Sequence, residues 1–503
     1  MRVKVAHAVA INGVAGAIVR VEAASLAGIP SFTVVGLGDT AVSESRERIK
    51  AAFAATGLGF PRTRITVNLS PADLPKVGTG FDVAIAGAIM AAASGRELPA
   101  NAVFIGELGL DGSVRQVHGV LPAALEAARQ GFHTAFVPHG CGQEAALAGL
   151  AVQELWHFSQ IARLLEVDAL PVPPAPVMET KTTAAESVPD MQDVLGQEEA
   201  RRAVEIAAAG GHHALLTGAP GIGKSMLAQR LPGILPPLSR AAAVEVGAIA
   251  SVLGEFSGTL SHTPPFAAPH HTATAAALVG GGNRPRPGAA SRAHHGLLFL
   301  DELPEFRGNA LQALRQPMET GEVQVFRARG ALRFPALFQL IGAANPCRCG
   351  KYIDSPAQCS CPVRERIRYW NRVGGPILDR FDINIVMRRP SRAALAMASA
   401  EASAPIAQRV AQARARQERR YRNCAWATNA RAPGSWIRQH THLPDTVQNQ
   451  FEQLLTRGEM SMRALDKIMR VAWSIADLAG RKHPELDDFA ESYAMRRHGI
   501  TAS

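Results

Sequence analysis

The amino-acid sequence predicts an α/β fold class with three structured parts: an α+β N-terminal domain, a central α/β domain and a C-terminal helical domain. Three observations support this division. Short β-branched runs alternate with helical stretches in the first part, a strand, a glycine-rich loop and a helix follow one another near residue 214, and the last part is rich in Ala and Arg with little strand signal. The expected bounds are residues 1–168, a linker at 169–190, then 191–390 and 391–503. A length of 503 residues agrees with this number of domains.

The composition excludes several classes of protein. Hydrophobic residues make up 47% of the chain and charged residues 19%, which is ordinary globular usage and excludes a wholly disordered or fibrous chain. The longest clean apolar stretch, Val83 to Ala93, is too short to span a bilayer, so we expect no membrane partner. The first residues resemble a signal peptide, but His7 and Asn12 interrupt the apolar run, and we expect a cytoplasmic protein.

Local patterns predict the elements of the N-terminal domain. Strands are expected at Ser31–Leu37, Arg64–Leu69 and Val103–Leu108, the last followed by an Asp-Gly hairpin turn at residues 111 and 112. A helix is expected from Asp39 to Thr56, capped by Asp39 or Thr40. The segment 170–190 is rich in Pro, Ala and Thr without apolar periodicity, which is typical of an exposed linker.

The central domain opens with a phosphate-binding motif. The apolar strand Ala214–Thr217 leads into a loop of the form GxxxxGKS and then a helical stretch. Glycines in this motif let backbone N–H groups converge on phosphate, the lysine reaches the β- and γ-phosphates of ATP, and the serine hydroxyl binds Mg²⁺. The predicted nucleotide-binding residues are Gly218, Ala219, Pro220, Gly221, Ile222, Gly223, Lys224 and Ser225.

Two further buried runs end in polar side chains. The strand at 296–300 ends in Asp301 and Glu302, where Asp301 is expected to hold Mg²⁺ with Ser225 and Glu302 to orient or polarise the attacking water. The run at 338–344 ends in Asn345, which is expected to contact the γ-phosphate; the alternative is an asparagine that only starts a turn. Because parallel strands present their carboxyl ends at one edge of a sheet, these residues are expected to form one site.

Two arginines are candidates for stabilising the transferred phosphoryl group. Arg380 lies among acidic residues, so it is either a local salt-bridge partner or an arginine finger that reaches across a subunit interface, which implies a ring. Arg463 begins a helix of the C-terminal domain and is expected to approach the same nucleotide.

Four of the six cysteines lie within 15 residues, as two C-x-C pairs. Four thiolates can close tetrahedrally on a structural Zn²⁺, although the tighter C-x-C spacing leaves free or redox-sensitive thiols as the alternative. The predicted zinc ligands are Cys347, Cys349, Cys359 and Cys361. Outside this cluster, cysteines are too sparse for a disulfide scaffold, which also favours a reducing compartment.

The net charge of +10 is concentrated at the C-terminal end, where residues 391–503 carry 17 basic and 11 acidic side chains. A basic terminal domain is compatible with contacts to a nucleic-acid backbone, and a solvated helical face explains the charge equally well.

The chain resembles the magnesium-chelatase-like subfamily of AAA+ ATPases, in the branch that includes bacterial competence proteins. Segments that carry the resemblance include ITVNLSPADLPKVGTGFD (65–82), PHHTATAAALVGGG (269–282), LLFLDELPEF (297–306), AANPCRCG (343–350) and GPILDRFD (375–382). The resemblance implies a homohexameric ring motor that migrates DNA branches during natural transformation, with recombination proteins as further partners. It also implies a helical lid at the C-terminal end. It also implies that residues 218–225 are Walker A, Asp301 and Glu302 Walker B, Asn345 sensor 1, Arg380 the finger and Arg463 sensor 2.

Two other resemblances concern parts of the chain. Residues 256–284, with His270 and His271, fall where this clade inserts a hairpin. Residues 75–82 resemble the nucleophile motif of Lon proteases, but Gly80 stands in the serine position and Leu121 at the place of the catalytic lysine. A Ser-Lys dyad needs both side chains, so we expect a Lon-like domain without protease activity.

Two other functions remain open from the sequence. One is an ATPase that drives metal insertion into a porphyrin, as the chelatase subunit does, and the other is an ATPase that remodels proteins.

Overall fold

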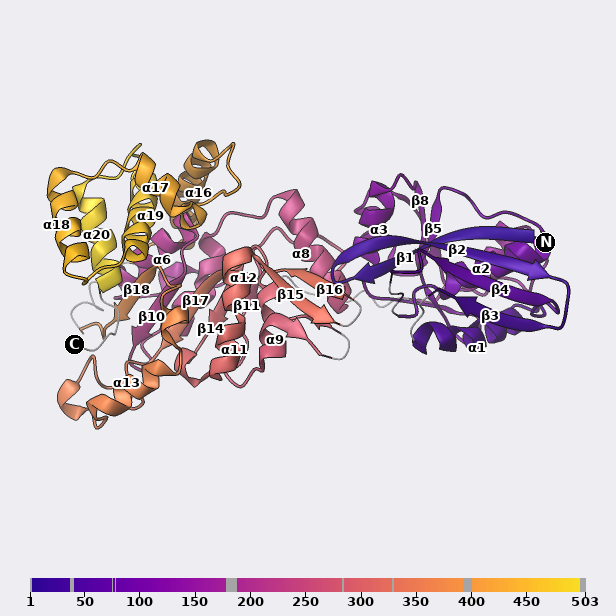
Figure 1. Ribbon diagram of the computed structural model, residues 1–503, viewed down its shortest axis with the longest axis horizontal. Helices are drawn as coiled ribbons and strands as arrows, with labels where there is room; N and C mark the ends of the chain where they lie inside the picture. The colour runs from indigo at the N-terminus through magenta and orange to yellow at the C-terminus, as the bar shows by residue number, and fades with distance from the viewer. Residues whose placement is uncertain are drawn as a thin grey trace.

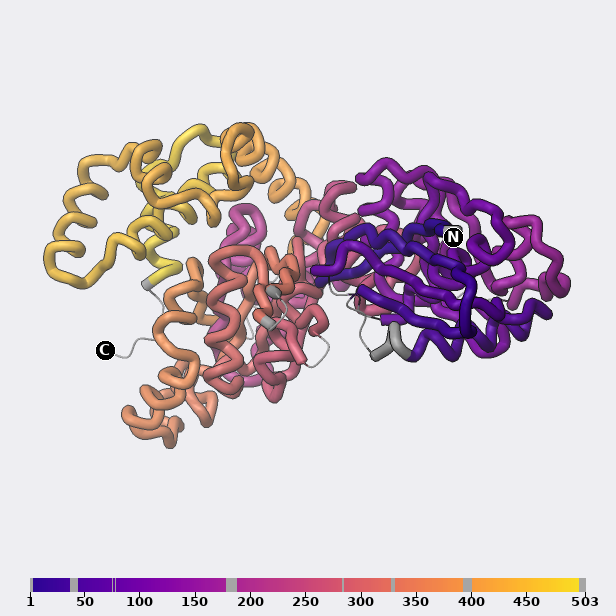
Figure 2. Tube along the Cα trace, turned by 45° about the vertical axis from the view of Figure 1, so that its right-hand side comes forward, coloured from indigo at the N-terminus to yellow at the C-terminus, as the bar shows by residue number. Residues whose placement is uncertain are grey.

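The computed structural model describes residues 2–36, 40–74, 76, 78–177, 188–282, 285–327, 330–391 and 400–497. The molecule is elongated, with an N-terminal lobe on one side and the central and C-terminal parts on the other (Figures 1 and 2). Ten residues of the expected linker, 178–187, and residues 392–399 near the expected second boundary lie outside the described ranges, so the domain bounds remain predictions.

The N-terminal lobe contains two sheets and a short hairpin. The larger sheet has the strand order β1-β2-β4-β3, with β3 parallel to β4 and the other pairs antiparallel, and the smaller parallel sheet runs β5-β8-β9. Its strands are β1 (Arg2–Asn12), β2 (Ala15–Leu26), β3 (Ser31–Val35), β4 (Arg64–Ser70), β5 (Ala102–Phe104), β6 (Glu107–Leu108), β7 (Val114–Arg115), β8 (Thr134–Pro138) and β9 (Ala151–Leu155). Its helices are α1 (Thr40–Ala55), α2 (Asp82–Ser94), α3 (Val120–Arg129), α4 (Gly142–Ala146) and α5 (Ser159–Leu164).

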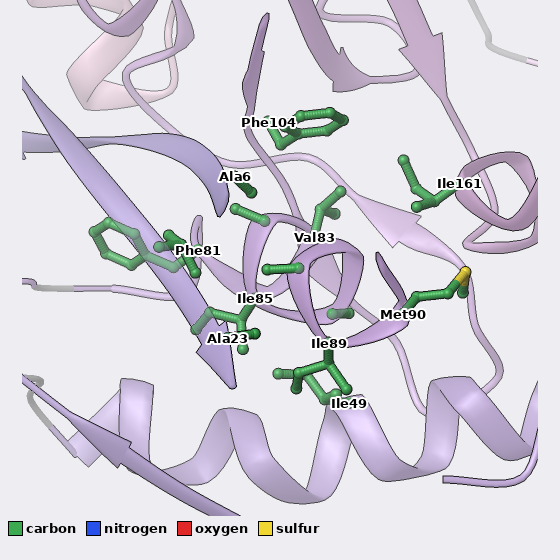
Figure 3. Packing of buried hydrophobic residues seen from close by; sticks show 14 of the residues in the cluster. Ala6, Ala23, Ile49, Phe81, Val83, Ile85, Ile89, Met90, Phe104 and Ile161 are labelled. Carbon is green, nitrogen blue, oxygen red and sulfur yellow. The ribbon is translucent and has the colours of Figure 1, made fainter. Parts of the chain in front are cut away.

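Helix α2 forms the centre of this lobe and explains the apolar run found in the sequence. All its residues from Asp82 to Ala92 are buried, and a helix that is apolar all round is stable only when surrounded by protein. In Figure 3, Ile89 of α2 lies near Ile49 of α1, while Phe104 and Ile161 close the cluster from other elements.

Most N-terminal elements agree with the sequence patterns. The Asp-Gly turn does join a hairpin, with Leu108 paired to Val114. The expected strand over 103–108 is interrupted, because Gly106 adopts a φ of +154° that breaks the pleat between β5 and β6. Asp39, one of the two expected caps of α1, lies outside the described residues.

The central part is built on a five-stranded sheet in the order β11-β14-β17-β10-β18, with all pairs parallel. Every residue of β10, β14 and β17 is buried, as expected for strands of a parallel sheet covered on both faces. The strands are β10 (Ala214–Gly218), β11 (Phe266–Ala267), β14 (Leu297–Leu300), β17 (Gln339–Ala344) and β18 (Ile383–Met387). The helices are α6 (Glu198–Gly210), α7 (Lys224–Arg230), α8 (Arg240–Leu253), α9 (Ala275–Val279), α10 (Ala289–Arg292), α11 (Gly308–Ala313), α12 (Arg315–Thr320), α13 (Val363–Asn371) and α14 (Gly375–Leu378), with 3-10 turns η1 (Met191–Asp193), η2 (Leu231–Ile234), η3 (Leu303–Glu305) and η4 (Pro356–Gln358).

The segment expected to hold an inserted hairpin contains only short elements in its described residues. Residues 256–282 contain only the edge strand β11, helix α9 and the two-residue strand β12 (Gly280–Gly281), which pairs with β13 (Arg286–Pro287); Arg284 lies outside the described residues. A longer hairpin, β15 (Glu322–Arg327) with β16 (Gly330–Pro335), follows further along the chain. Phe326 near its tip is 76% exposed.

The C-terminal part is helical, as expected. Its elements are α16 (Ser403–Arg420), η5 (Asn429–Arg431), α17 (Gly434–His440), α18 (Asp445–Thr456), α19 (Met462–Leu478) and α20 (Leu486–Arg497). Helix α19 is buried along most of its length and packs on α6, where Ser474 Oγ lies 2.7 Å from His212 Nε2. The mixed α/β fold class is therefore confirmed.

The two lobes meet through α3 and α8, which lie against each other (Figure 1). The backbone N–H of Gly119 donates to the carbonyl of Ser251 at 3.0 Å, and the N–H of Leu121 reaches the Ser251 hydroxyl at 3.3 Å. Within the described residues, no helix has both the length and the apolar character needed to cross a bilayer.

Candidate functional site

The phosphate loop connects β10 to α7. Gly221 and Gly223 have φ values of +72° and +98°, a conformation that glycine adopts without steric cost, and Gly223 caps α7. Lys224 folds over the loop: its Nζ donates to the carbonyls of Gly218 and Ala219 at 2.7 and 2.9 Å and to Asn345 Oδ1 at 3.0 Å. The lysine of the loop and the asparagine at the end of β17 are thus in direct contact.

Burial lowers the pKa of Lys224, and three acidic side chains oppose this shift: Asp301, Glu302 and Asp354. The amine therefore lies in a negatively charged surrounding within a half-enclosed site. Asp354 is an addition to the residues expected from the sequence, because nothing in its local pattern relates it to the phosphate loop.

Ser225 and Asp301 form the candidate magnesium site. The Ser225 hydroxyl donates to Asp301 Oδ2 at 2.5 Å, which joins the first turn of α7 to the end of β14. A hydroxyl and a carboxylate oxygen are hard ligands of the kind that Mg²⁺ prefers, so the residues present fit this ion. This geometry agrees with the expectation that Ser225, which follows β10 through the phosphate loop, and Asp301, which follows β14, belong to one site.

Glu302 has an unusual backbone. Its φ of +51° is rare for a residue with a side chain, and its N–H donates to Asp301 Oδ1 at 2.8 Å. The carboxylate is 53% exposed and lies 2.9 Å from Nδ1 of His271. His271, which the sequence placed in an inserted hairpin, therefore contacts a candidate catalytic carboxylate.

The two candidate arginines are close enough for the charge of Arg463 to affect Arg380, and in the described residues neither bonds to the phosphate loop. Arg380, which follows α14, pairs with Glu319 of α12. Burial lowers the pKa of Arg380, and the positive charges of Arg315 and Arg463 lower it further. No hydrogen bond or ion pair in the described part of the chain joins Arg380 or Arg463 to residues 218–225, 301, 302 or 345.

Arg380 does not form its ion pair with the acidic residues beside it in the sequence. The adjacent acids are engaged elsewhere: Asp382 lies 3.4 Å from Lys467, and Asp379 lies 3.5 Å from Arg496. Helices α19 and α20 thereby hold the segment that carries Arg380, which links the C-terminal helices to the position of this arginine.

The four clustered cysteines converge. The Sγ atoms of Cys347, Cys349 and Cys359 are 3.4 to 3.7 Å apart, and all four sulfurs, with that of Cys361, lie within 4.8 Å of one another. Zn–S bonds of about 2.3 Å place tetrahedral ligands roughly 3.8 Å apart, so the set fits a zinc ion. All six cysteines of the chain are free thiols.

A second group of possible ligands comprises Glu245, His294 and His295. Nε2 of each histidine lies 2.8 to 2.9 Å from the Glu245 carboxylate. However, the N–H of Leu337 donates to Nδ1 of His294 at 3.0 Å, so the proton of the neutral ring is on Nε2 and blocks the atom that would bind a metal. This group is a hydrogen-bond network.

The Lon-like positions do not form a protease site in the described residues. Gly80 accepts a backbone hydrogen bond from Gly106, and Leu121 is buried beside α8 at the contact between the lobes. Lys76 is fully buried and its amine donates to the carbonyl of Pro71. Pro75 and Val77 lie outside the described residues.

Strands β10, β14 and β17 are neighbours in one parallel sheet, and their carboxyl ends bring a phosphate loop together with the acidic and amide side chains expected around a nucleotide. This fold and site define an ATPase of the P-loop AAA+ class.

Comparisons with known proteins give the family. The family model for magnesium chelatase subunit ChlI matches residues 190–395, its C-terminal model matches 400–496, and a model for subunit ChlI of Mg-chelatase matches 21–141. An uncharacterized protein of Mycobacterium tuberculosis is 44% identical over 98% of both chains. Competence protein ComM of Haemophilus influenzae is 37% identical over 99% of this chain and 98% of its own, and uncharacterized protein YifB of Escherichia coli is 38% identical over 95% and 94%. The chain belongs to the magnesium-chelatase-like AAA+ ATPases.

Proposed function

We propose that the protein is an ATP-driven motor that works as a homohexameric ring in the cytoplasm and migrates branches in DNA. The observation that carries this proposal is that, in the described residues, no hydrogen bond or ion pair joins the two candidate arginines to the phosphate-loop site of their own chain. Lys224, Ser225, Asp301, Glu302 and Asn345 gather around the phosphate loop as one half of a site. Arg380 instead pairs with Glu319, and the charge of Arg463 acts on it, so these two arginines are the candidates for the other half. A nucleotide bound between neighbouring copies of the chain would receive both halves.

The chemistry of the first half-site is hydrolysis of the γ-phosphate. Lys224 holds the phosphates, Asn345 contacts the γ-phosphate, and Glu302 polarises the attacking water. When bound to Ser225 and Asp301, Mg²⁺ neutralises phosphate charge. Arg380 and Arg463 of the next copy stabilise the charge that develops during transfer.

The assignment of DNA as the partner rests on similarity and surface chemistry. ComM, a competence protein by name, is similar to this chain over nearly its whole length. The basic C-terminal region adds positive charge, and Phe326 near the tip of the β15–β16 hairpin offers an exposed aromatic ring on which a base can stack. These features support branched DNA of natural transformation as the substrate, with recombination proteins as further partners.

We also assign a structural Zn²⁺ to the cysteine cluster. Four converging thiolates saturate the tetrahedral preference of this ion and leave no open position for catalysis. Elemental analysis of the purified protein tests this assignment, with about one zinc per chain expected and an absence of zinc as the contrary result.

Assays on a four-way DNA junction test the motor function. The wild-type chain with ATP and Mg²⁺ is expected to convert the junction into separate duplexes by branch migration. The Lys224→Ala variant, which lacks the phosphate-binding amine, is the matched inactive control. ATP hydrolysis that is indifferent to every DNA structure would contradict a DNA motor. Stimulation by a porphyrin or by an unfolded protein would instead support metal insertion or protein remodelling.

A further inference from the structure

The segment that carries the four cysteines also touches the phosphate loop. Gly350 lies between the two C-x-C pairs and has a φ of +76°. Its Cα is so close to Pro220 that an added Cβ would lie 2.4 Å from Cδ and 2.8 Å from Cγ of that proline. Pro220 is the third residue of the phosphate loop, so the turn of the cysteine segment packs directly on the element that receives the phosphates.

The same segment is joined to the asparagine of the site. Cys347 follows Asn345 by two residues, and Pro346 between them accepts a hydrogen bond from Trp370 Nε1 at 3.2 Å. Asn345 in turn binds the Lys224 amine. Cys347 is fully buried, so the start of the cysteine segment is anchored in the core beside the site.

Further along the segment, Asp354 adds a negative charge near the same amine. Arg366 of α13 donates to the carbonyl of Cys361 at 3.3 Å, and its guanidinium lies 3.9 Å from the centre of the Tyr352 ring. These contacts join the second C-x-C pair to the middle of the segment. The segment from Asn345 to Asp354 therefore reaches the phosphate loop at three points, and its cysteines can be cross-linked by a metal.

We propose that the metal-bound cysteine segment braces the phosphate loop, so that loading of the metal sets the affinity for ATP. This inference rests on the zinc assignment made above and does not depend on DNA. Without the metal, four thiols replace a closed tetrahedral cross-link, and the turn at Gly350 is no longer held on Pro220. Small displacements of groups that position phosphates lower the affinity for ATP, because binding and catalysis depend on their placement to within about 1 Å.

Two variants distinguish the effect of the metal from the effect of the contact between Gly350 and Pro220. Replacing both half-buried thiols of the second pair, Cys359→Ser with Cys361→Ser, removes the metal, with Cys424→Ser as the control for loss of an isolated cysteine. Gly350→Ala keeps all four thiols but inserts a methyl group against Pro220. Its control is Gly149→Ala, where φ is +79° and no atom lies within 4 Å of the added Cβ, so this variant has the same backbone strain without the contact.

The measurements are the zinc content of each chain and the dissociation constant of a fluorescent ATP analogue with Mg²⁺, in the absence of DNA. We expect the double cysteine variant to lose zinc and to bind the analogue at least about tenfold more weakly, and Gly350→Ala to keep zinc but bind about fivefold more weakly. Both controls should match the wild type.

Three results would overturn the brace. The first is unchanged affinity in a Gly350→Ala variant that retains zinc, and the second is unchanged affinity in a double cysteine variant without zinc. The third is a wild-type protein that contains no zinc and still binds the analogue. If the double variant fails to fold, Gly350→Ala decides. These binding measurements contain no DNA. A failure of the separate branch-migration assay would therefore count against the motor function and would not contradict this inference.

Discussion

Nδ1 of His271 lies 2.9 Å from the carboxylate of Glu302, which joins the turn after β14 to the segment that follows β11. Glu302 also holds a left-handed backbone conformation. A side chain in that conformation needs surrounding contacts to fix its direction, and His271 supplies one. His271 is therefore a positioning residue for the carboxylate that is proposed to polarise water.

Replacing His271 by alanine is expected to lower the kcat of ATP hydrolysis about tenfold while leaving KM nearly unchanged, because the carboxylate loses a fixed orientation and the phosphate contacts remain. His271→Asn, whose amide can donate from a similar position, should restore most of the rate. His270→Ala is the matched control, since the His270 Nδ1 contacts Thr272 and the ring only neighbours that of His271. Equal loss in both alanine variants would contradict the positioning role.

The Glu302→Gln variant is expected to bind ATP with wild-type affinity and to hydrolyse it at least about 100-fold more slowly, since an amide cannot accept the proton of the attacking water. Nucleotide binding by equilibrium titration and phosphate release by a stopped assay measure the two properties separately. Retention of full hydrolysis would show that another group polarises the water.

The Lys224→Ala variant should behave differently, because its change removes a contact to the phosphates. We expect binding of the ATP analogue to weaken by at least about 100-fold, which corresponds to the loss of a charge-assisted contact in a half-enclosed site. Tight binding in this variant, checked by the same titration, would exclude the assigned role of the lysine.

The buried His294 predicts a pH dependence of stability. Burial first, and then the charge of His295, lower the pKa of His294 to about 4. Its unfolded pKa is near 6.5, so the unfolded chain binds the proton more tightly, and the stabilisation present above pH 6.5 is lost as the pH falls toward 4. Between pH 7.5 and 5.0 this histidine should reduce the free energy of unfolding by about 2 kcal/mol.

Denaturant unfolding at the two pH values tests this expectation. His294→Asn retains an acceptor for the Leu337 N–H but does not titrate, so its loss of stability on acidification should be smaller than that of the wild type. His440→Asn, at an exposed histidine, is the control for replacing a histidine by asparagine. An identical pH dependence in His294→Asn and the wild type would refute the assignment.

The sequence predicted the parts of the site that follow from local pattern. The apolar run at 297–300 forms β14, and the motif at 218–225 connects a strand to a helix, because burial and glycine conformation are local properties of these residues. The geometry also joins Ser225 to Asp301 and Lys224 to Asn345, as the rule for parallel sheets leads one to expect.

Contacts between distant segments could not be predicted in this way. Arg380 pairs with Glu319, although acids stand beside it in the sequence, and Gly350 packs on Pro220 across a long loop. No period or motif encodes such pairs, since they depend on how the elements pack. The β15–β16 hairpin is a different case, because Val323 and Val325 alternate with the polar Glu322 and Gln324, and this local pattern is typical of a strand.

The central claim is that ATP is split between neighbouring copies of the chain, and mixing two inactive variants tests it most directly. Arg380→Ala keeps an intact phosphate loop, and Lys224→Ala keeps an intact arginine, so each alone should be unable to hydrolyse ATP. In an equimolar mixture that exchanges subunits, about one quarter of the seams join an intact loop to an intact arginine, and we expect a corresponding recovery of ATPase activity. No recovery in confirmed mixed rings, or full hydrolysis by a chain that stays monomeric, would contradict the account.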